Sequence, residues 1–108
     1  MTTIPGNLFT QAETPTAGER FDELLCHRNL VIERIVSSSA TERCEYVQPQ
    51  DEWVMLVQGE AMMTVAGKTV TLKAGDYLFL PAHVPHTVEH TSHGAIWLAI
   101  HLHPDAPG

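Results

Sequence analysis

The sequence predicts an all-β fold, an antiparallel sandwich or barrel, from three observations. Short runs rich in β-branched, aliphatic and aromatic residues alternate with turn residues from residue 20 onward. No run of helical length has the roughly 3.6-residue periodicity of an amphipathic helix. The pattern therefore lacks the helices that connect the strands of a parallel sheet. Many short strands with short connections are typical of antiparallel folds built from two sheets.

Nine segments have the composition of strands, and turn residues separate them. In chain order they are residues 21–26, 30–36, 43–47, 52–58, 61–65, 69–72, 77–80, 86–90 and 96–102. The best-defined hairpin joins 61–65 to 69–72 through Ala66 and Gly67, because glycine readily adopts the positive φ of a two-residue turn. A chain of 108 residues has room for one such domain.

Two of these segments are apolar on both faces of the predicted sheet. In 52–58, Trp53 and Met55 alternate with Val54 and Leu56, and 96–102 has the same pattern. We therefore expect both segments to be buried on both faces, with one face lining the barrel. The second sheet or a partner subunit would cover the other face. For so small a chain, a homodimer is the favoured arrangement.

The N-terminal segment differs in composition from the rest of the chain. Residues 1–19 contain two prolines and two glycines among small polar residues. This composition predicts an irregular arm with one short extended piece at 7–10. We expect the compact barrel domain to span residues 20–104.

The charge and the hydropathy of the chain argue against nucleic acid and membrane partners. It has 13 acidic and 6 basic side chains, a formal charge of -7, and its cations are scattered, so nucleic acid is not expected to bind. No stretch approaches the roughly 20 apolar residues of a membrane span, and the N-terminus lacks the features of a secretory signal. We expect a cytoplasmic protein with no membrane partner, in which Cys26 and Cys44 are reduced thiols.

The stretch from Gly75 to His86 resembles the second sequence motif of the cupin family. That motif runs from a glycine through a proline to a histidine, and Gly75, Pro81 and His86 have its spacing. His83 stands where the motif usually has a further glycine. The resemblance implies a small single-domain cupin of the cupin 2 type, folded as an antiparallel double-stranded β-helix, the cupin jelly-roll barrel. It also implies a homodimer.

A second stretch resembles the end of the first cupin motif, in which six residues separate a metal-binding glutamate from a glycine. Glu52 and Gly59 have this spacing, and the histidine pair that usually opens the motif falls on Tyr46 and Gln48. The resemblance places these two residues, with Glu52 and His86, where four metal ligands usually converge. It implies a divalent transition metal, Fe, Mn, Ni or Zn, held by Gln48, Glu52 and His86. With fewer nitrogen donors, this set should bind the later metals less tightly than three histidines do.

The alternation of side chains along a strand suggests roles for two further residues. Tyr46 shares a face with Gln48 and is expected to be an aromatic wall of the cavity with a polar tip. His101 shares a face with Trp97 and Ala99, so it is either an inward ligand or acid–base group, or a hydrogen-bonded histidine near a strand end. Tyr46 and His101 are the candidate catalytic residues.

The remaining histidines are assigned by the same alternation. His90 shares the face of His86, which would place it deeper in the cavity or behind the metal ligands as a hydrogen-bond donor. His86, His90 and His93 also have the spacing of one helical face, but Pro85 and the β-branched residues around them favour a strand. We expect the other four to lie on the surface: His27, His83, His93 and His103.

Three functions remain open at this point. The first is a metal-dependent enzyme, an oxygenase, isomerase or lyase, in which the ion polarises a small organic substrate or activates dioxygen and Tyr46 or His101 moves a proton. The second is a non-catalytic barrel that binds or senses a small molecule. The third is a purely structural role, with the polar residues forming a hydrogen-bonded cluster in the core. Metal analysis separates the first function from the third.

Overall fold

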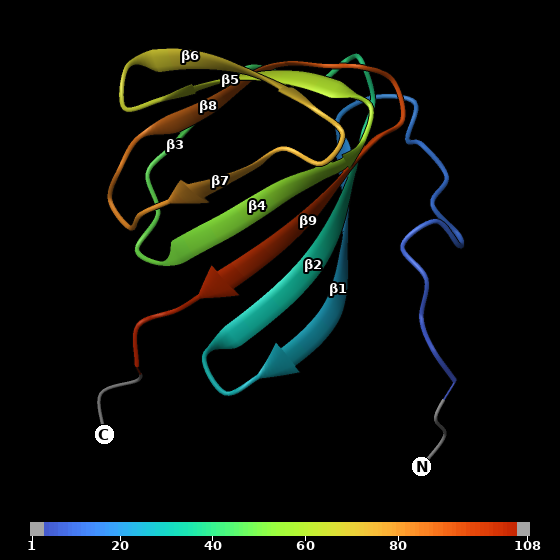
Figure 1. Ribbon diagram of the computed structural model, residues 1–108, viewed down its shortest axis with the longest axis horizontal. Helices are drawn as coiled ribbons and strands as arrows, with labels where there is room; N and C mark the ends of the chain where they lie inside the picture. Colours follow the sequence, from blue (N-terminus) through green and yellow to red (C-terminus); the bar gives the residue numbers. More distant parts are fainter. Residues whose placement is uncertain (1–3, 106–108) are drawn as a thin grey trace.

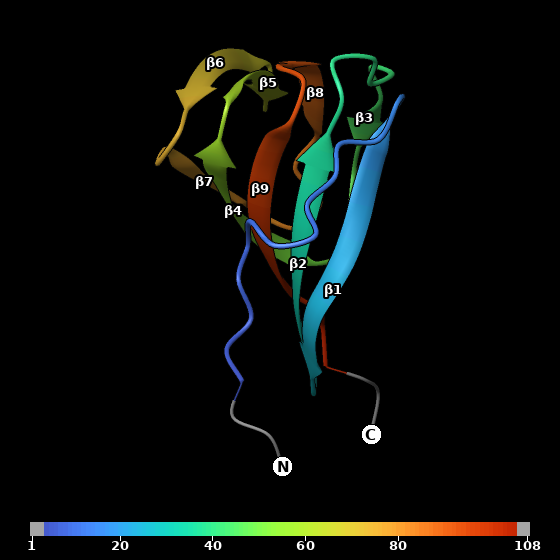
Figure 2. The same cartoon turned by 90° about the vertical axis from the view of Figure 1, so that its right-hand side faces the viewer.

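The computed structural model describes residues 4–105, which form nine strands in two antiparallel sheets (Figure 1). The five-stranded sheet contains, in spatial order, β1 (Glu19–His27), β2 (Leu30–Ser37), β9 (Ala95–Leu102), β4 (Asp51–Gln58) and β7 (Tyr77–Leu80). The four-stranded sheet contains β3 (Glu45–Tyr46), β8 (His86–Thr91), β5 (Glu60–Val65) and β6 (Lys68–Lys73). Figure 2 shows the long strands of the first sheet side by side, with β1 at its edge. The predicted all-β jelly roll is confirmed.

Each of the nine predicted segments contains a strand, and most boundaries differ by only a few residues. The largest difference is in 43–47, where only Glu45 and Tyr46 pair with β8. The extended piece predicted at 7–10 is wrong, because this segment forms a turn. The backbone N–H of Phe9 donates to the side-chain oxygen of Asn7 at 2.8 Å. An Asn side chain that binds the backbone two residues ahead is typical of a turn and competes with an extended conformation.

The hydrophobic core lies between the two sheets. Every second side chain of β4 and β9 points inward, because successive residues of a strand face opposite sides of the sheet. The core residues at most 3% exposed include Val54, Leu56, Ala61, Met63, Leu72, Leu80, Ala95, Trp97 and Ala99. Each large aliphatic side chain in this set contributes roughly 1.5–3 kcal/mol by its burial. The sheets therefore enclose one core, and four of its residues also line the cavity described below: Val54, Met63, Leu80 and Trp97.

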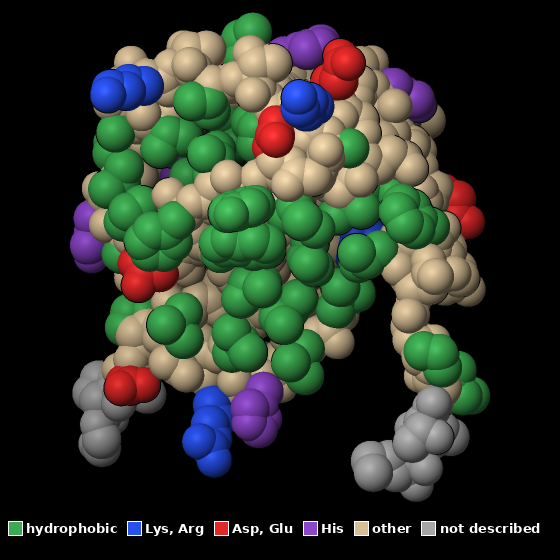
Figure 3. Space-filling view, viewed as in Figure 1, with side chains coloured by type: hydrophobic (Ala, Val, Ile, Leu, Met, Phe, Trp, Pro, Cys, Tyr) green, Lys and Arg blue, Asp and Glu red, His purple; other side chains and the backbone are tan. Residues whose placement is uncertain are grey.

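The second sheet does not cover the outer face of 52–58 and 96–102, so burial of these segments on both faces requires a partner subunit and stays a prediction. Trp53 and Met55 are only partly buried there, and Phe79 of the neighbouring strand β7 is 58% exposed. The reason is that the four-stranded sheet packs against the inner face alone. Figure 3 shows hydrophobic side chains gathered over this outer face, where β7, β4 and β9 lie.

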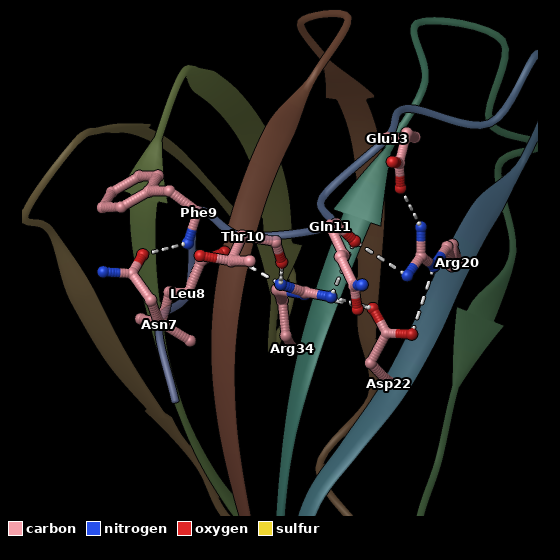
Figure 4. A network of polar contacts seen from close by, with 9 residues as sticks. All are labelled: Asn7, Leu8, Phe9, Thr10, Gln11, Glu13, Arg20, Asp22 and Arg34. Atoms are coloured by element: carbon pink, nitrogen blue, oxygen red, sulfur yellow. Dashed lines mark hydrogen bonds and ion pairs between the residues drawn. The ribbon is translucent and has the colours of Figure 1, made fainter. Parts of the chain in front are cut away.

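The N-terminal arm is fixed to the five-stranded sheet by a buried arginine. Arg34 lies on the outer face of β2 and is 6% exposed. Its guanidinium donates to the carbonyl oxygens of Leu8, Thr10 and Gln11 at 2.8–3.1 Å and to the carboxylate of Asp22 at 2.8 and 3.0 Å (Figure 4). A buried charge is tolerated only when its hydrogen-bonding groups are satisfied. The arm carbonyls therefore complete the solvation of this side chain.

Two sequence-based expectations concern the chemistry of the chain outside the site. Cys26 and Cys44 are both exposed and are not joined in a disulfide. The part of the chain that the structure describes contains no helix with the length and apolar character needed to span a bilayer.

We predict that replacing Arg34 with methionine destabilises the fold by about 2–4 kcal/mol, because the carbonyls of Leu8 and Thr10 lose the donor that Arg34 supplies. Asp22 and the Gln11 carbonyl also lose Arg34 but still accept hydrogen bonds from Arg20. Urea unfolding measures this loss, and limited proteolysis should show faster cleavage within residues 4–13. Arg43→Met is the matched control, since Arg43 is exposed and forms an ion pair with Glu89 at the surface, so that its replacement should cost about 1 kcal/mol or less. Equal losses for the two variants would contradict the role assigned to Arg34.

Candidate functional site

A cavity of about 100 Å³ lies between the two sheets and is lined by residues from both. Its polar lining consists of Glu19, Glu33, Tyr46, Gln48, Glu52, His86 and His101. Its apolar lining consists of Phe21, Ile35, Val54, Met63, Leu80, Val88 and Trp97. Phe21 and Tyr46 are 56% and 43% exposed, so they mark the mouth. The structure thus brings all five sequence-predicted site residues, Tyr46, Gln48, Glu52, His86 and His101, to one cavity.

Two tight turns hold the strands that carry these residues. Gly59, which follows β4, has a φ of 91°, and a Cβ atom there would lie 2.6 Å from the Ser92 hydroxyl oxygen, so no other residue fits. His83 has a φ of 66°, which glycine adopts at lower cost than histidine. The backbone N–H of His83 donates to the carbonyl of Gln48 at 2.7 Å. The turn before β8 therefore positions the loop before β4.

Glu52 is at the centre of the polar contacts. Its side chain is buried, and its Oε1 accepts a hydrogen bond from the Gln48 amide at 3.0 Å. The same oxygen lies 3.8 Å from Nδ1 of His101. These contacts cross from the loop before β4 to β9, because Glu52 and His101 are directly paired residues of neighbouring strands. The carboxylate therefore already has a donor and a neighbouring imidazole.

His101 is held by a second carboxylate. Its Nε2 lies 2.8 Å from Oε1 of Glu33 on β2, and its Nδ1 lies 3.3 Å from the Gln50 amide. The hydrogen bond from His101 to Glu33 raises the pKa of His101, burial opposes it, and the nearby charge of Glu52 adds to the increase. The protonated imidazole is thus stabilised between the carboxylates of Glu33 and Glu52.

The third carboxylate of the cavity belongs to Glu19 at the start of β1. Its Oε2 accepts a hydrogen bond of 2.6 Å from the Ser37 hydroxyl, which in turn accepts one of 3.1 Å from the Trp97 indole. Burial raises the pKa of Glu19, the bond from Ser37 opposes this, and the charges of Glu33 and Glu52 add to it. Glu19 therefore has a fixed orientation and no basic side chain among its hydrogen-bond partners.

His86 and Tyr46 stack on each other at the other wall of the cavity. Their ring centroids are 5.8 Å apart, and the residues pair directly across β3 and β8. His86 is 5% exposed, and its Nδ1 is buried without a hydrogen-bond partner in the described part of the chain. Burial also raises the pKa of the Tyr46 phenol. His86 is thus the least satisfied polar side chain of the site.

The prediction that His90 shares the cavity with His86 is wrong. The pairing of β5 with β8 shifts register between Met62 and Met63, so that Met63 opposes Val88 while Met62 opposes His90. Such a β-bulge inserts one residue, Glu89, and reverses the inward and outward alternation beyond it. His90 is therefore exposed on the outside of the four-stranded sheet.

The other histidines lie where they were expected, with one exception. His27, His83 and His93 are exposed, as predicted. His103 is only partly exposed, and its ring stacks on His101 with centroids 6.1 Å apart. His103 lies just beyond the end of β9, so the imidazoles of His101 and His103 are neighbours at this end of the strand.

Sequence reasoning missed two carboxylates of the cavity, Glu33 and Glu19. The sequence does contain a signal for Glu33. It is one of two charged residues in the segment 30–36, and it has the strand parity of Ile35, whereas Arg34 has the opposite parity. Glu19 left no comparable signal, because it lies at the end of the segment predicted to be an irregular arm. The structure places it in β1 instead.

The donor set does not match a cupin metal site with three histidines. Among the described residues, no group of three or more His, Cys, Asp or Glu side chains is placed to hold a metal ion. The positions of the usual histidine pair carry Tyr46 and Gln48, and the Gln48 amide is bound to Glu52. His101, the other nearby imidazole, has both ring nitrogens in contact with protein groups. The groups that remain as ligands for an ion are the Glu52 carboxylate, the His86 imidazole and the side-chain oxygen of Gln48.

Comparisons with known proteins agree with this two-sheet fold. Residues 35–104 match the family model for the cupin domain, and the chain belongs to the cupin family. No match was found among curated proteins.

Three solved structures illustrate the range of similarity. A putative mannose-6-phosphate isomerase from Ralstonia eutropha is 36% identical, with 94% of this chain and 99% of that chain covered and a TM-score of 0.84. An RmlC-like cupin from Shewanella frigidimarina is 24% identical, with coverages of 87% and 86% and a TM-score of 0.75. A conserved Streptococcus pyogenes protein of unknown function is 18% identical, with coverages of 98% and 92% and a TM-score of 0.81. The last two share the fold alone.

We predict that Glu33→Gln lowers the pKa of His101, because the variant replaces the carboxylate that holds the imidazolium. Since the folded pKa is raised, the stability that this proton contributes is fully present below the ordinary value of 6.5 and is lost as the pH rises through the folded pKa. The excess stability of the wild type over the variant should therefore shrink across that interval.

Proton NMR titration of the His101 ring measures the pKa, and urea unfolding at several pH values measures the stability. Glu60→Gln is the control, because Glu60 is exposed and does not line the cavity. An unchanged His101 titration in Glu33→Gln would rule out the assigned contact.

Proposed function

We propose that the chain binds a small organic molecule in the barrel cavity, through direct contacts with its polar side chains. The observation that carries this proposal is the contact of His101 with Glu33 at 2.8 Å and with Glu52 at 3.8 Å. Together with the bond from Gln48 to Glu52, it fixes the polar groups before any ligand arrives. Groups held in this way lose little further freedom when a ligand binds.

The same contacts support a role in proton transfer. Glu33 raises the pKa of His101, and burial raises the pKa of the Tyr46 phenol that lines the cavity. We propose that His101 and Tyr46 exchange protons with the bound molecule if it is turned over. A binding or sensing role without turnover uses the same cavity, and comparing substrate loss with binding separates the two.

The cavity also limits the class of molecule. A volume of about 100 Å³ is smaller than the roughly 150 Å³ cavity that accepts benzene in a protein core, although this cavity is open at Phe21 and Tyr46. The name of the protein from Ralstonia eutropha, a putative mannose-6-phosphate isomerase, suggests a phosphorylated sugar as substrate. Three carboxylates and no Lys or Arg line this cavity among the described residues, so a phosphate dianion would be repelled. We therefore do not extend that activity to this chain.

A second candidate function is metal binding, and one observation favours it. The buried Nδ1 of His86 has no partner in the described chain, and Glu52 lines the same cavity. Gln48, Glu52 and His86 would hold the ion, Fe, Mn, Ni or Zn. Such an ion would compete with the hydrogen bond between Gln48 and Glu52, which supports direct binding of an organic molecule as the first candidate.

We also propose that two copies of the chain form a homodimer through the outer face of the five-stranded sheet. Trp53, Met55, Tyr77 and Phe79 lie on that face, and Tyr77 and Phe79 are 65% and 58% exposed. A face formed by such uncharged side chains can pair with its own copy without burying unpaired charges. A cytoplasmic location stays a prediction.

The binding function predicts that small molecules of about benzene size perturb the cavity and not the outer face. The chain provides an internal comparison, because Trp97 lines the cavity and Trp53 lies outside it. NMR with a panel of cationic, uncharged and anionic compounds should shift the Trp97 indole while leaving that of Trp53 unchanged. Val88→Phe, which fills the cavity, should abolish the shifts, and Val57→Phe, in β4 and outside the cavity lining, should not.

The same experiment tests the metal candidate. Zn²⁺ alone should shift the His86 ring only if that candidate holds, and Glu52→Ala should then remove the effect while His93→Ala retains it. A panel in which no compound shifts Trp97 would refute the proposed binding function.

The homodimer predicts a mass of twice 11.9 kDa in sedimentation equilibrium. Phe79→Lys should give the monomer mass, because it introduces a charge into the pairing face. Met62→Lys is the control, since Met62 is 38% exposed on the other sheet. A monomeric wild type at all concentrations would exclude the dimer.

A further inference from the structure

We infer that the molecule bound in the cavity is a small organic cation that carries an ammonium group. This inference rests on the proposed binding function and names its ligand class. It is drawn from the juxtaposition of Glu19, Glu33 and Glu52 in one cavity whose described lining contains no Lys or Arg.

The carboxylates of the cavity exceed its cations. His101 is the basic group that contacts them, and it lies between Glu33 and Glu52. Glu19 is left with a hydroxyl and no cation as its hydrogen-bond partner. Taking a carboxylate out of water without a countercharge is costly, and burial indeed raises the pKa of Glu19. A cationic ligand would supply the missing charge, whereas an anion would add to the repulsion.

His86 provides a second and independent observation. It lines the same cavity and is 5% exposed, and neither of its ring nitrogens makes a hydrogen bond within the described chain, although Nδ1 is fully buried. A neutral imidazole accepts a hydrogen bond at its unprotonated nitrogen. An ammonium N–H group is a strong donor, so it satisfies both an imidazole and a carboxylate. The donors and acceptors of the cavity therefore fit an ammonium better than a hydroxyl alone.

The apolar lining distinguishes an organic cation from a metal ion. Phe21, Tyr46 and Trp97 contribute aromatic side chains, and Ile35 and Val54 contribute aliphatic ones. Aromatic faces attract organic ammonium groups, and aliphatic walls bury the attached carbon atoms. A divalent ion gains nothing from these walls, because it needs several oxygen or nitrogen ligands. The wall and the carboxylates together select a compact amine.

The test uses three probes that share a tert-butyl group and differ in charge: neopentylammonium, neopentyl alcohol and pivalate. Calorimetry and the Trp97 indole shift measure their binding to the full chain at neutral pH. We expect neopentylammonium to bind at least about tenfold more tightly than the alcohol and pivalate to show no binding. Tetramethylammonium, which lacks N–H groups, should bind more weakly than neopentylammonium if His86 accepts a hydrogen bond.

Two variants assign the preference to the cavity. Glu19→Gln removes a charge while keeping the side-chain shape, and it should reduce the preference for the ammonium over the alcohol by about tenfold. Glu60→Gln should leave it unchanged. The probe series on the wild type is decisive by itself if Glu19→Gln fails to fold.

The outcomes separate this inference from the proposed function. Equal or tighter binding of the alcohol or pivalate at Trp97 overturns the cation inference and leaves the binding function intact. Binding of Zn²⁺ without binding of any ammonium also overturns it, in favour of the metal candidate. No response to any probe or to the wider panel overturns both.

Discussion

The contact of His101 with two carboxylates is the interaction on which the candidate site depends. Glu33, His101 and Glu52 come from β2, β9 and β4, which are consecutive strands of one sheet. Slipping either pairing by one residue would turn a carboxylate to the opposite face. The apolar residues that alternate with these groups fix the register, since Trp97 and Val54 must face the core. The hydrophobic pattern of the sheet thus determines the geometry of its charges.

Strand β2 illustrates how the fold accommodates charge on both of its faces. Glu33 points into the cavity toward His101, while its neighbour Arg34 points outward and is covered by the N-terminal arm. Glu33 is partly buried and Arg34 is buried, and each has an oppositely charged or hydrogen-bonding partner, as buried charges require. The arm therefore serves as the partner of Arg34 on the outer face, as His101 serves as the partner of Glu33 in the cavity. The two charges make β2 sensitive to substitution from either side.

The fold was predictable from the sequence because its signals are local. Turn residues delimited the strands, and the spacing of Glu52 with Gly59 and of Gly75 with His86 resembled known motifs. The alternation of side chains along the strand also correctly predicted that His101 can face the cavity. It failed for His90, because a bulge in β8 arises from pairing with β5 and leaves no local signal. Glu19 was missed because its role depends on Ser37, a residue far along the chain.

The shortness of β3 has a consequence for how molecules reach the cavity. Only Glu45 and Tyr46 pair with β8, whereas the neighbouring pairings span many more residues. Local opening of so short an edge strand costs far less than global unfolding. Tyr46 therefore stands at an entrance that can widen while the core strands stay paired. The rate at which a bound molecule enters and leaves would then depend on opening of β3. Its affinity would depend on the contacts inside the cavity, so residence time and affinity could vary independently.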